Sequence, residues 1–136
     1  MDHYTGSCLC GGIQYEINGE LEPVQICHCQ QCRKAQGAAL VTNIPVSTEQ
    51  FSIIQGEDLL TAYESSPGKH RVFCSRCGSP IISRLESLPD VVRVRAGTLD
   101  GEPPLTLSGH AFVGSKASWW PITDDLPQLK AGRPAK

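Results

Sequence analysis

Apolar and polar residues alternate in many short runs along this chain of 136 residues. In residues 13–17 every second side chain is apolar, which is the period of a strand with one buried face. His3 to Cys10 reads as a short strand that enters a metal knuckle. Comparable runs, broken by turn residues, predict further strands at 24–27, 38–46, 51–55, 59–64, 70–73, 80–83, 91–97 and 105–112.

Helical spacing is rare in the sequence. One helical turn is expected at residues 33–37, ended by Gly37, and one short helix within residues 115–129. We therefore predict a mainly β protein of antiparallel sheets with short helical turns. In residues 91–97 apolar residues alternate with Arg93 and Arg95, so the arginines are expected on the exposed face. The length suits one domain, residues 1–129, followed by a polar tail, residues 130–136, that is expected to fray.

The seven cysteines fall into three clusters, so one chemical role should account for all of them. The clusters are Cys8-Leu9-Cys10, Cys27-His28-Cys29-Gln30-Gln31-Cys32 and Cys74-Ser75-Arg76-Cys77. An odd number of thiols cannot pair off completely, and a small disulfide scaffold would carry more cysteine and a signal sequence. Clustered thiols in a reducing compartment indicate metal binding or catalysis instead.

Zinc chemistry suggests how the thiols divide. A structural zinc takes four ligands in a closed shell, which the pairs Cys8/Cys10 and Cys74/Cys77 supply together. The remaining thiols, Cys27, Cys29 and Cys32, give three ligands and an open position, as in a catalytic zinc site. We therefore expect two Zn²⁺ ions per chain.

Alternatives to this division remain. A distant residue could complete the second site and make it structural as well, and an iron–sulfur cluster would also accept thiolates, although it normally uses four. His28 alternates with the cysteines beside it, so on an extended backbone it should point away from the metal as an ordinary hydrogen-bonded histidine.

Three thiolates around Zn²⁺ leave a net charge of −1 at the site, which disfavours activation of water and favours capture of a substrate thiol. Arg33 and Lys34 follow the cluster and either offset this charge or are solvated surface cations. There is no Gly-rich phosphate loop, no His-Glu-x-x-His helix and no Gly-x-Ser-x-Gly elbow, so nothing favours phosphoryl transfer, metalloprotease or serine-hydrolase chemistry.

The net charge and the hydropathy of the chain argue against two classes of partner, nucleic acids and membranes. The net charge is −2, which argues against a nucleic-acid partner. The N-terminus has neither a basic region nor an apolar stretch of a signal peptide, and no apolar run is long enough to cross a membrane. We expect a cytoplasmic protein with no membrane partner; its oligomeric state is not readable from the sequence.

The cysteine motifs, in this order, resemble the glutathione-dependent formaldehyde-activating enzyme family. They are Gly6-Ser7-Cys8-Leu9-Cys10-Gly11-Gly12, Cys27-His28-Cys29-Gln30-Gln31-Cys32-Arg33 with Gly37, and Phe73-Cys74-Ser75-Arg76-Cys77-Gly78. The run from His110 to Trp119 is similar to the terminal segment of that family. The resemblance covers the chain from Gly6 to about Leu129.

The resemblance implies a zinc-stapled β-tent of two packed antiparallel sheets. It implies a structural zinc at Cys8, Cys10, Cys74 and Cys77, and a catalytic zinc at Cys27, Cys29 and Cys32. It also implies a carbon–sulfur lyase activity that joins glutathione, or another small thiol, with formaldehyde or another aldehyde. The product would be S-(hydroxymethyl)glutathione, formed when the glutathione sulfur reaches the open zinc position as thiolate and attacks the aldehyde carbon.

Two points stay open at this stage. The family also includes centromere protein V, which looks like a chromatin-associated protein, so a zinc-binding scaffold without chemistry is the alternative function. No motif marks a glutathione pocket. Trp119, Lys116 and Arg95 are candidates for it, but a core aromatic residue and two surface cations are the favoured interpretations.

Overall fold

Two β-sheets and one short α-helix make up residues 2–132, which are the residues that the computed structural model describes. The elements in chain order are β1 (His3–Ser7), β2 (Gln14–Asn18), β3 (Val24–Cys27), α1 (Gln30–Gln36), β4 (Val41–Ser47), β5 (Phe51–Gln55), β6 (Leu60–Ser66), β7 (Lys69–Cys74), β8 (Pro80–Leu85), β9 (Leu88–Arg95) and β10 (Leu107–Ala111). Short 3₁₀ turns lie at Glu57–Leu59, Ala96–Thr98 and Val113–Ser115.

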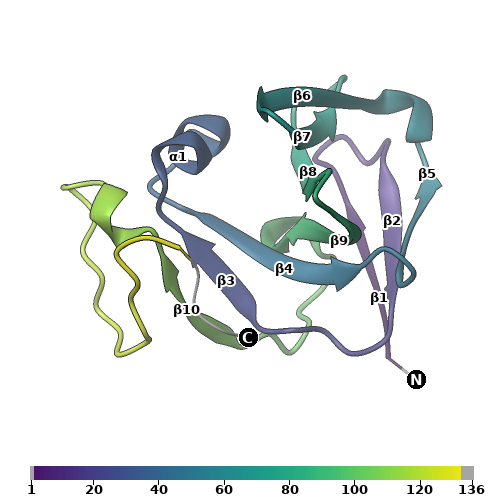
Figure 1. Ribbon diagram of the computed structural model, residues 1–136. Helices are drawn as coiled ribbons and strands as arrows, with labels where there is room; N and C mark the ends of the chain where they lie inside the picture. The colour runs from purple at the N-terminus through teal and green to yellow at the C-terminus, as the bar shows by residue number, and fades with distance from the viewer. Residues whose placement is uncertain (1, 133–136) are drawn as a thin grey trace.

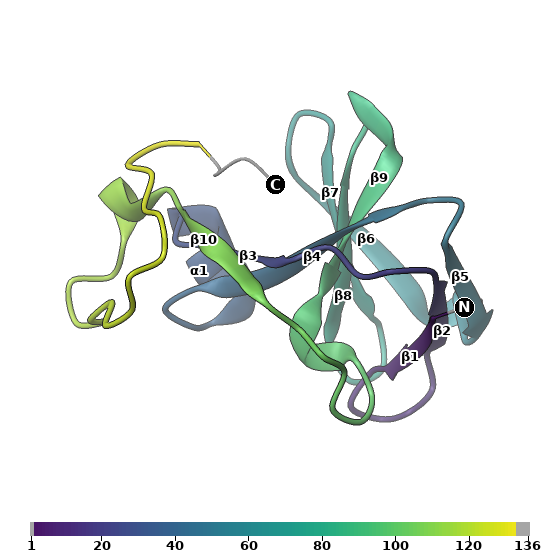
Figure 2. The same cartoon turned by 90° about the horizontal axis from the view of Figure 1, so that it is seen from below.

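The smaller sheet has the order β1-β2-β5 and the larger has the order β10-β3-β4-β9-β8-β7-β6. Figure 1 shows β1, β2 and β5 at one side of the long sheet, with α1 at the other side, and Figure 2 shows the same arrangement from below. Every strand pair is antiparallel except β10 with β3, which is parallel. The predicted class, mainly β with antiparallel sheets and short helical turns, is confirmed.

The predicted strand bounds agree best with the structure where residues that favour turns flank the strand. β3 and β5 have the predicted bounds. The strand expected from residue 38 starts only at Val41, because α1 is longer than expected and ends at Gly37, whose φ of 63° is left-handed. Pro45 is tolerated within β4 because the pairing of β4 with β3 stops at Asn43.

The helix predicted within residues 115–129 is wrong. Only the 3₁₀ turn Val113–Ser115 reaches this region. The chain returns beside β10, where the N–H of His110 donates to the carbonyl of Pro127 and the N–H of Leu129 donates to the carbonyl of His110. Pro121 and Pro127, which lack the backbone N–H, disfavour a continuous helix here. Within residues 2–132, no helix has both the length and the apolar composition that crossing a membrane requires.

The main core lies between the two sheets. Tyr15 and Ile17 of β2 are fully buried against apolar side chains of the larger sheet, among them Ile44 of β4 and Val94 of β9. The Tyr15 ring crosses β1 at Gly6, where an added Cβ would lie 2.1 Å from the ring. Gly6 is therefore required by close packing.

The opposite face of the larger sheet is polar and also buried, which the sequence pattern does not predict. Arg95 was expected on an exposed face but is only 4% exposed. The strand registers put it on one face with Gln25, Asn43, Arg71 and Ser83, and all of these are buried. Cys27 ends β3 on the same face as Gln25, so this face leads to the central cysteine cluster.

The first residues of the predicted C-terminal tail are hydrogen-bonded to the segment after β10. Residues 130–132 were expected to fray with the rest of the tail, yet the carbonyls of Lys130 and Gly132 accept hydrogen bonds from the backbone of Gly114 and Phe112. The remaining part of the predicted tail, residues 133–136, lies outside the described residues.

Candidate metal centres

The thiols of Cys8, Cys10, Cys74 and Cys77 meet at one point between the N-terminal sheet and the end of β7. Their sulfurs all lie within 4.8 Å of one another. Cys10 Sγ is 3.5 Å from Cys8 Sγ and 3.9 Å from Cys74 Sγ. Tetrahedral zinc with Zn–S bonds of ~2.3 Å needs sulfurs about 3.8 Å apart, so this four-thiol group fits a closed metal site.

The local backbone aims these sulfurs inward. The N–H of Ile13 donates to Cys8 Sγ at 3.2 Å, and the N–H of Cys77 donates to Cys74 Sγ at 3.4 Å. Gly11 and Gly78 follow the two cysteine pairs with φ of 76° and 81°, the left-handed conformation that tight knuckles need and that side chains disfavour. Because glycine tolerates this conformation, the role of the glycines after Cys10 and Cys77 could be predicted from the sequence.

Hydrogen bonds stabilise the thiolate form in this group. The Arg76 Nε donates to Cys10 Sγ at 3.4 Å and lowers the pKa of that thiol. The hydroxyl and backbone of Ser79 lower the pKa of Cys77 to about 5. Because the thiolate is the form that binds metal, both shifts favour ligation, whereas burial raises the pKa of the Cys8 thiol.

The second group holds Cys27, Cys29 and Cys32, whose sulfurs also lie within 4.8 Å of one another. Cys27 ends β3, Cys29 is the N-cap of α1 and accepts the N–H of Cys32 at 3.3 Å, and Cys32 lies in the first turn of the helix. Cys27 and Cys32 are each 1% exposed, whereas Cys29 is partly exposed. Within residues 2–132, no other His, Cys, Asp or Glu belongs to this three-thiol group.

His28 does not join the three-thiol group. Its Nε2 lies 2.8 Å from Nδ1 of His110, and Nε2 of His110 lies 3.0 Å from a carboxylate oxygen of Asp124. Both histidines are buried, and His28 is hydrogen-bonded as expected. The chain of hydrogen bonds ties the cysteine loop to β10 and to the segment that follows it.

Two arginines lie beside the three-thiol group: Arg71, which the sequence alone did not single out, and Arg95, which was a candidate for the glutathione pocket. Nη1 and Nη2 of Arg71 are 3.9 and 3.8 Å from Cys32 Sγ, and Nε donates to Ser65 Oγ at 3.0 Å. Hydrogen bonds from Cys27 and Cys29, together with Arg71, lower the pKa of the Cys32 thiol. The strand at residues 70–73 could be predicted from the sequence, but the strand order that places Arg71 beside Cys32 could not.

Arg95 is the second of these arginines. Its Nη1 donates to Oδ1 of Asn43 and, at 3.3 Å, to Ser83 Oγ. Burial lowers its pKa to about 10, while the nearby Cys32 opposes that shift. The surface-cation interpretation of Arg95 is therefore wrong. Arg33 is half-buried and Lys34 is exposed, and no hydrogen bond to a cysteine sulfur is found for either within residues 2–132.

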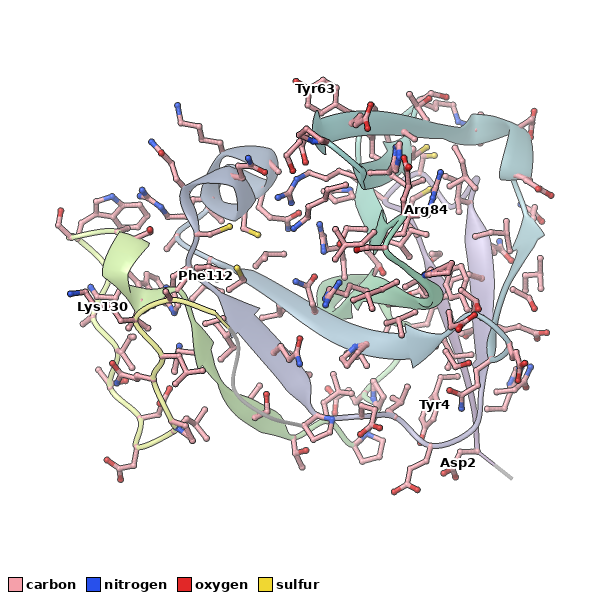
Figure 3. The ribbon with its side chains drawn as sticks, in the orientation of Figure 1. Asp2, Tyr4, Tyr63, Arg84, Phe112 and Lys130 are labelled. Atoms are coloured by element: carbon pink, nitrogen blue, oxygen red, sulfur yellow. The ribbon has the colours of Figure 1, made fainter. Side chains whose placement is uncertain are left out.

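A cavity of about 380 Å³ lies between α1 and the polar face of the larger sheet. Figure 3 shows sulfur atoms below α1 and side-chain nitrogens on the sheet side facing them. Tyr63, labelled in Figure 3, stands at the rim on β6. The lining residues are Ala35, Gln36, Tyr63, Arg71, Val72, Phe73, Gly78, Pro80, Ile82 and Arg95.

The other two candidate pocket residues lie elsewhere. Trp119 was favoured as a core aromatic residue, but it is 67% exposed and meets Trp120 edge-on. It borders a smaller cleft of about 250 Å³ that Arg33 and Lys34 also line. Lys116 is half-buried and donates to the carbonyls of Ala117 and Trp120.

Comparison with known proteins gives three findings. A family profile described as "Glutathione-dependent formaldehyde-activating enzyme" matches residues 3–115. A protein of Halomonas elongata, provisionally named a glutathione-dependent formaldehyde-activating enzyme, is 28% identical over 125 residues, which cover 84% of this chain and 77% of that protein. A crystal structure of a Rhodobacter sphaeroides protein has the same fold, with a TM-score of 0.61 at 22% identity over 74% of this chain and 91% of that one.

Proposed function

This chain belongs to the glutathione-dependent formaldehyde-activating enzyme family, and from that premise we propose that it is a zinc-dependent carbon–sulfur lyase acting on a glutathione adduct. In the synthetic direction it joins glutathione and formaldehyde to S-(hydroxymethyl)glutathione. The observation that carries the proposal is the three-thiol group of Cys27, Cys29 and Cys32, which has no fourth ligand from the described residues and lies beside a cavity.

The proposed reaction forms one carbon–sulfur bond. The sulfur of glutathione attacks the carbonyl carbon of formaldehyde, the C=O π electrons move to the oxygen, and the proton lost by the thiol ends on that oxygen. Zinc bound by Cys27, Cys29 and Cys32 would supply an electrophilic position that lowers the pKa of a substrate thiol. Arg71 and Arg95 offset part of the negative charge that three thiolates bring to this face of the sheet.

In this proposal the four-thiol group of Cys8, Cys10, Cys74 and Cys77 binds a second zinc that acts on the fold alone. Sulfur separations of 3.5 and 3.9 Å support that role, because they match a closed tetrahedral shell. Thiolate ligands of this kind persist in a reducing compartment, so we place the protein in the cytoplasm.

NMR exchange measurements on a mixture of glutathione, formaldehyde and their adduct test the activity. Zinc-loaded protein should speed the exchange well above the rate in buffer. Cys29→Ser should lose this acceleration by more than about a hundredfold, since it removes a ligand of the proposed site. An exchange rate equal to that in buffer, with two zinc ions bound, would contradict the proposal.

A zinc-binding scaffold without chemistry is the second candidate, and one observation favours it. Cys27 and Cys32 are as deeply buried as Cys8 and Cys74 of the four-thiol group. The scaffold predicts that glutathione does not bind and that neither zinc exchanges with added metal. The enzyme predicts glutathione binding and a labile zinc at the three-thiol group.

A further inference from the structure

We propose that the 380 Å³ cavity beside α1 is a carboxylate subsite, in which Arg71 and Arg95 bind the carboxylate of a thiol whose sulfur occupies the three-thiol group. The inference rests on the proposed function and narrows its substrate class to small thiols that carry a carboxylate close to the sulfur.

The two arginines are buried with no carboxylate partner among residues 2–132, and Arg71 contacts the sulfur of Cys32. Arg71 is 8% exposed and Arg95 is 4% exposed. Their hydrogen-bond partners are hydroxyl, amide and thiol groups, and the ion pairs found within residues 2–132 include neither of them. A buried cation is costly unless it is paired, so these positions favour an anion that arrives from outside the chain.

The metal centre alone does not balance this charge. Zinc and three thiolates together carry −1, whereas Arg71 and Arg95 carry +2. Arg93 lies two residues before Arg95 on the same strand face and adds positive potential there. The metal centre and the two arginines therefore carry a net charge of about +1 before a substrate binds, which favours an anionic ligand over a neutral one.

The geometry lets one small molecule reach both partners. Arg71 is 3.8 Å from Cys32 Sγ, and a fourth sulfur ligand in a tetrahedral site lies about 3.8 Å from the same atom. Cys32, Ala35 and Gln36 share one face of α1 because they are three and four residues apart, so the helix presents the metal ligand and the cavity wall together.

The cavity also has the make-up of a small-molecule site. Its volume lies within the ~300–1,000 Å³ typical of ligand pockets. Ala35, Phe73 and Pro80 contribute apolar lining. Gln36 Oε1 is buried without a hydrogen-bond partner and is available to a donor on the ligand, such as an amide N–H. A guanidinium fork is the side chain best suited to hold a carboxylate in such a site.

The test compares two ligands that differ in one charge. Zinc-loaded wild-type protein is titrated by calorimetry with 3-mercaptopropionate and with its methyl ester. We expect the acid to bind at least about tenfold more tightly, which is the effect of one charge-assisted hydrogen-bond pair. Equal affinities for the two thiols would overturn the inference while leaving the proposed function standing. Binding of neither thiol would also overturn the inference, whereas the proposed function is decided separately by the exchange of glutathione and formaldehyde.

A variant separates ligand binding from tuning of the metal. Arg71→Gln should bring the affinity ratio of acid to ester close to one, whereas Arg84→Gln, a change at an exposed arginine of β8, should leave the ratio unchanged. If Arg71→Gln weakens both thiols equally, Arg71 acts only on the cysteines and the inference fails. Should Arg71→Gln not fold, Arg71→Lys keeps the charge without the fork, and the ratio should fall by at least threefold but stay above one; an unchanged ratio there would count against the subsite.

Discussion

At the scale of single residues, burial changes the chemistry of side chains whose types look ordinary in the sequence. Arg71 and Arg95 read as strand cations, yet both are buried on the face that leads to Cys27. Tyr15 is fully buried in the main core, and its hydroxyl lies 2.6 Å from Thr98 Oγ1. The alternation in residues 13–17 predicts that Tyr15 is buried, but the burial of the two arginines could not be predicted from the sequence, because burial on both faces of a strand depends on which segments cover it.

Tyr15 gives a prediction about pH. Burial raises the pKa of Tyr15 to about 12, while the unfolded chain loses the same proton near the ordinary value of 10.0. As pH rises from 10 to 12 only the unfolded state gains from ionisation, so stability should fall by up to about 2–3 kcal/mol from this group.

Tyr15→Phe should remove this alkaline loss, at a cost of about 1 kcal/mol at neutral pH for the hydrogen bond to Thr98. Denaturant unfolding between pH 7 and pH 12 measures both effects. Tyr63→Phe, at a tyrosine that is 64% exposed, is the control. Its free energy of unfolding should fall with rising pH as steeply as that of the wild type. A Tyr15→Phe slope identical to wild type would contradict the buried position of Tyr15.

At the scale of elements, turn residues and the alternation of apolar and polar positions predicted most strands. The remaining differences in element bounds come from tertiary packing. β3 and β5 have the expected bounds because turns or the cysteine loop limit them. β4 starts late because α1 extends to Gln36. No helix forms between Ser115 and residue 132, because part of that segment is hydrogen-bonded to β10. The β10–β3 pairing is parallel and joins segments far apart in the chain, which no local pattern reveals.

Gly6 gives a prediction about sheet packing. A Cβ at this position would lie 2.1 to 2.5 Å from atoms of the Tyr15 ring, which is held in the core. Gly6→Ala should therefore destabilise the protein by about 1–3 kcal/mol, the usual cost of overpacking. Gly97→Ala is the matched control, since an added Cβ there meets nothing within 4 Å. Thermal unfolding of the two variants checks this, and equal melting temperatures would refute the close contact.

At the scale of the whole molecule, the two thiol groups act over very different chain lengths. The four-thiol group joins Cys10 and Cys74, which are 64 residues apart, whereas the three-thiol group spans only one loop and the start of a helix. The sequence suggested this division by counting ligands. It could not supply Arg71, the cavity or the polar sheet face, because these depend on strand order and register.

The difference in span predicts different responses to mutation. Cys74→Ser removes a proposed ligand that closes a long loop, and zinc binding of this kind contributes on the order of 10 kcal/mol, comparable to the stability of a whole domain. We expect this variant to be largely unfolded. Cys29→Ser should stay folded and bind one zinc, because the lost site constrains only a short segment. Circular dichroism and metal analysis distinguish the two variants, and a folded Cys74→Ser protein with two zinc ions would contradict the staple.

The most direct test of the central claim is the sulfur coordination of zinc, measured by X-ray absorption on the zinc-loaded protein with and without glutathione. One site with four sulfurs and one with three should give a mean of about 3.5 sulfurs per zinc, rising to about 4 when the glutathione thiol binds. Two zinc ions that each have four sulfurs before glutathione is added, or a mean that does not change on its addition, would contradict an open, thiol-binding site at Cys27, Cys29 and Cys32.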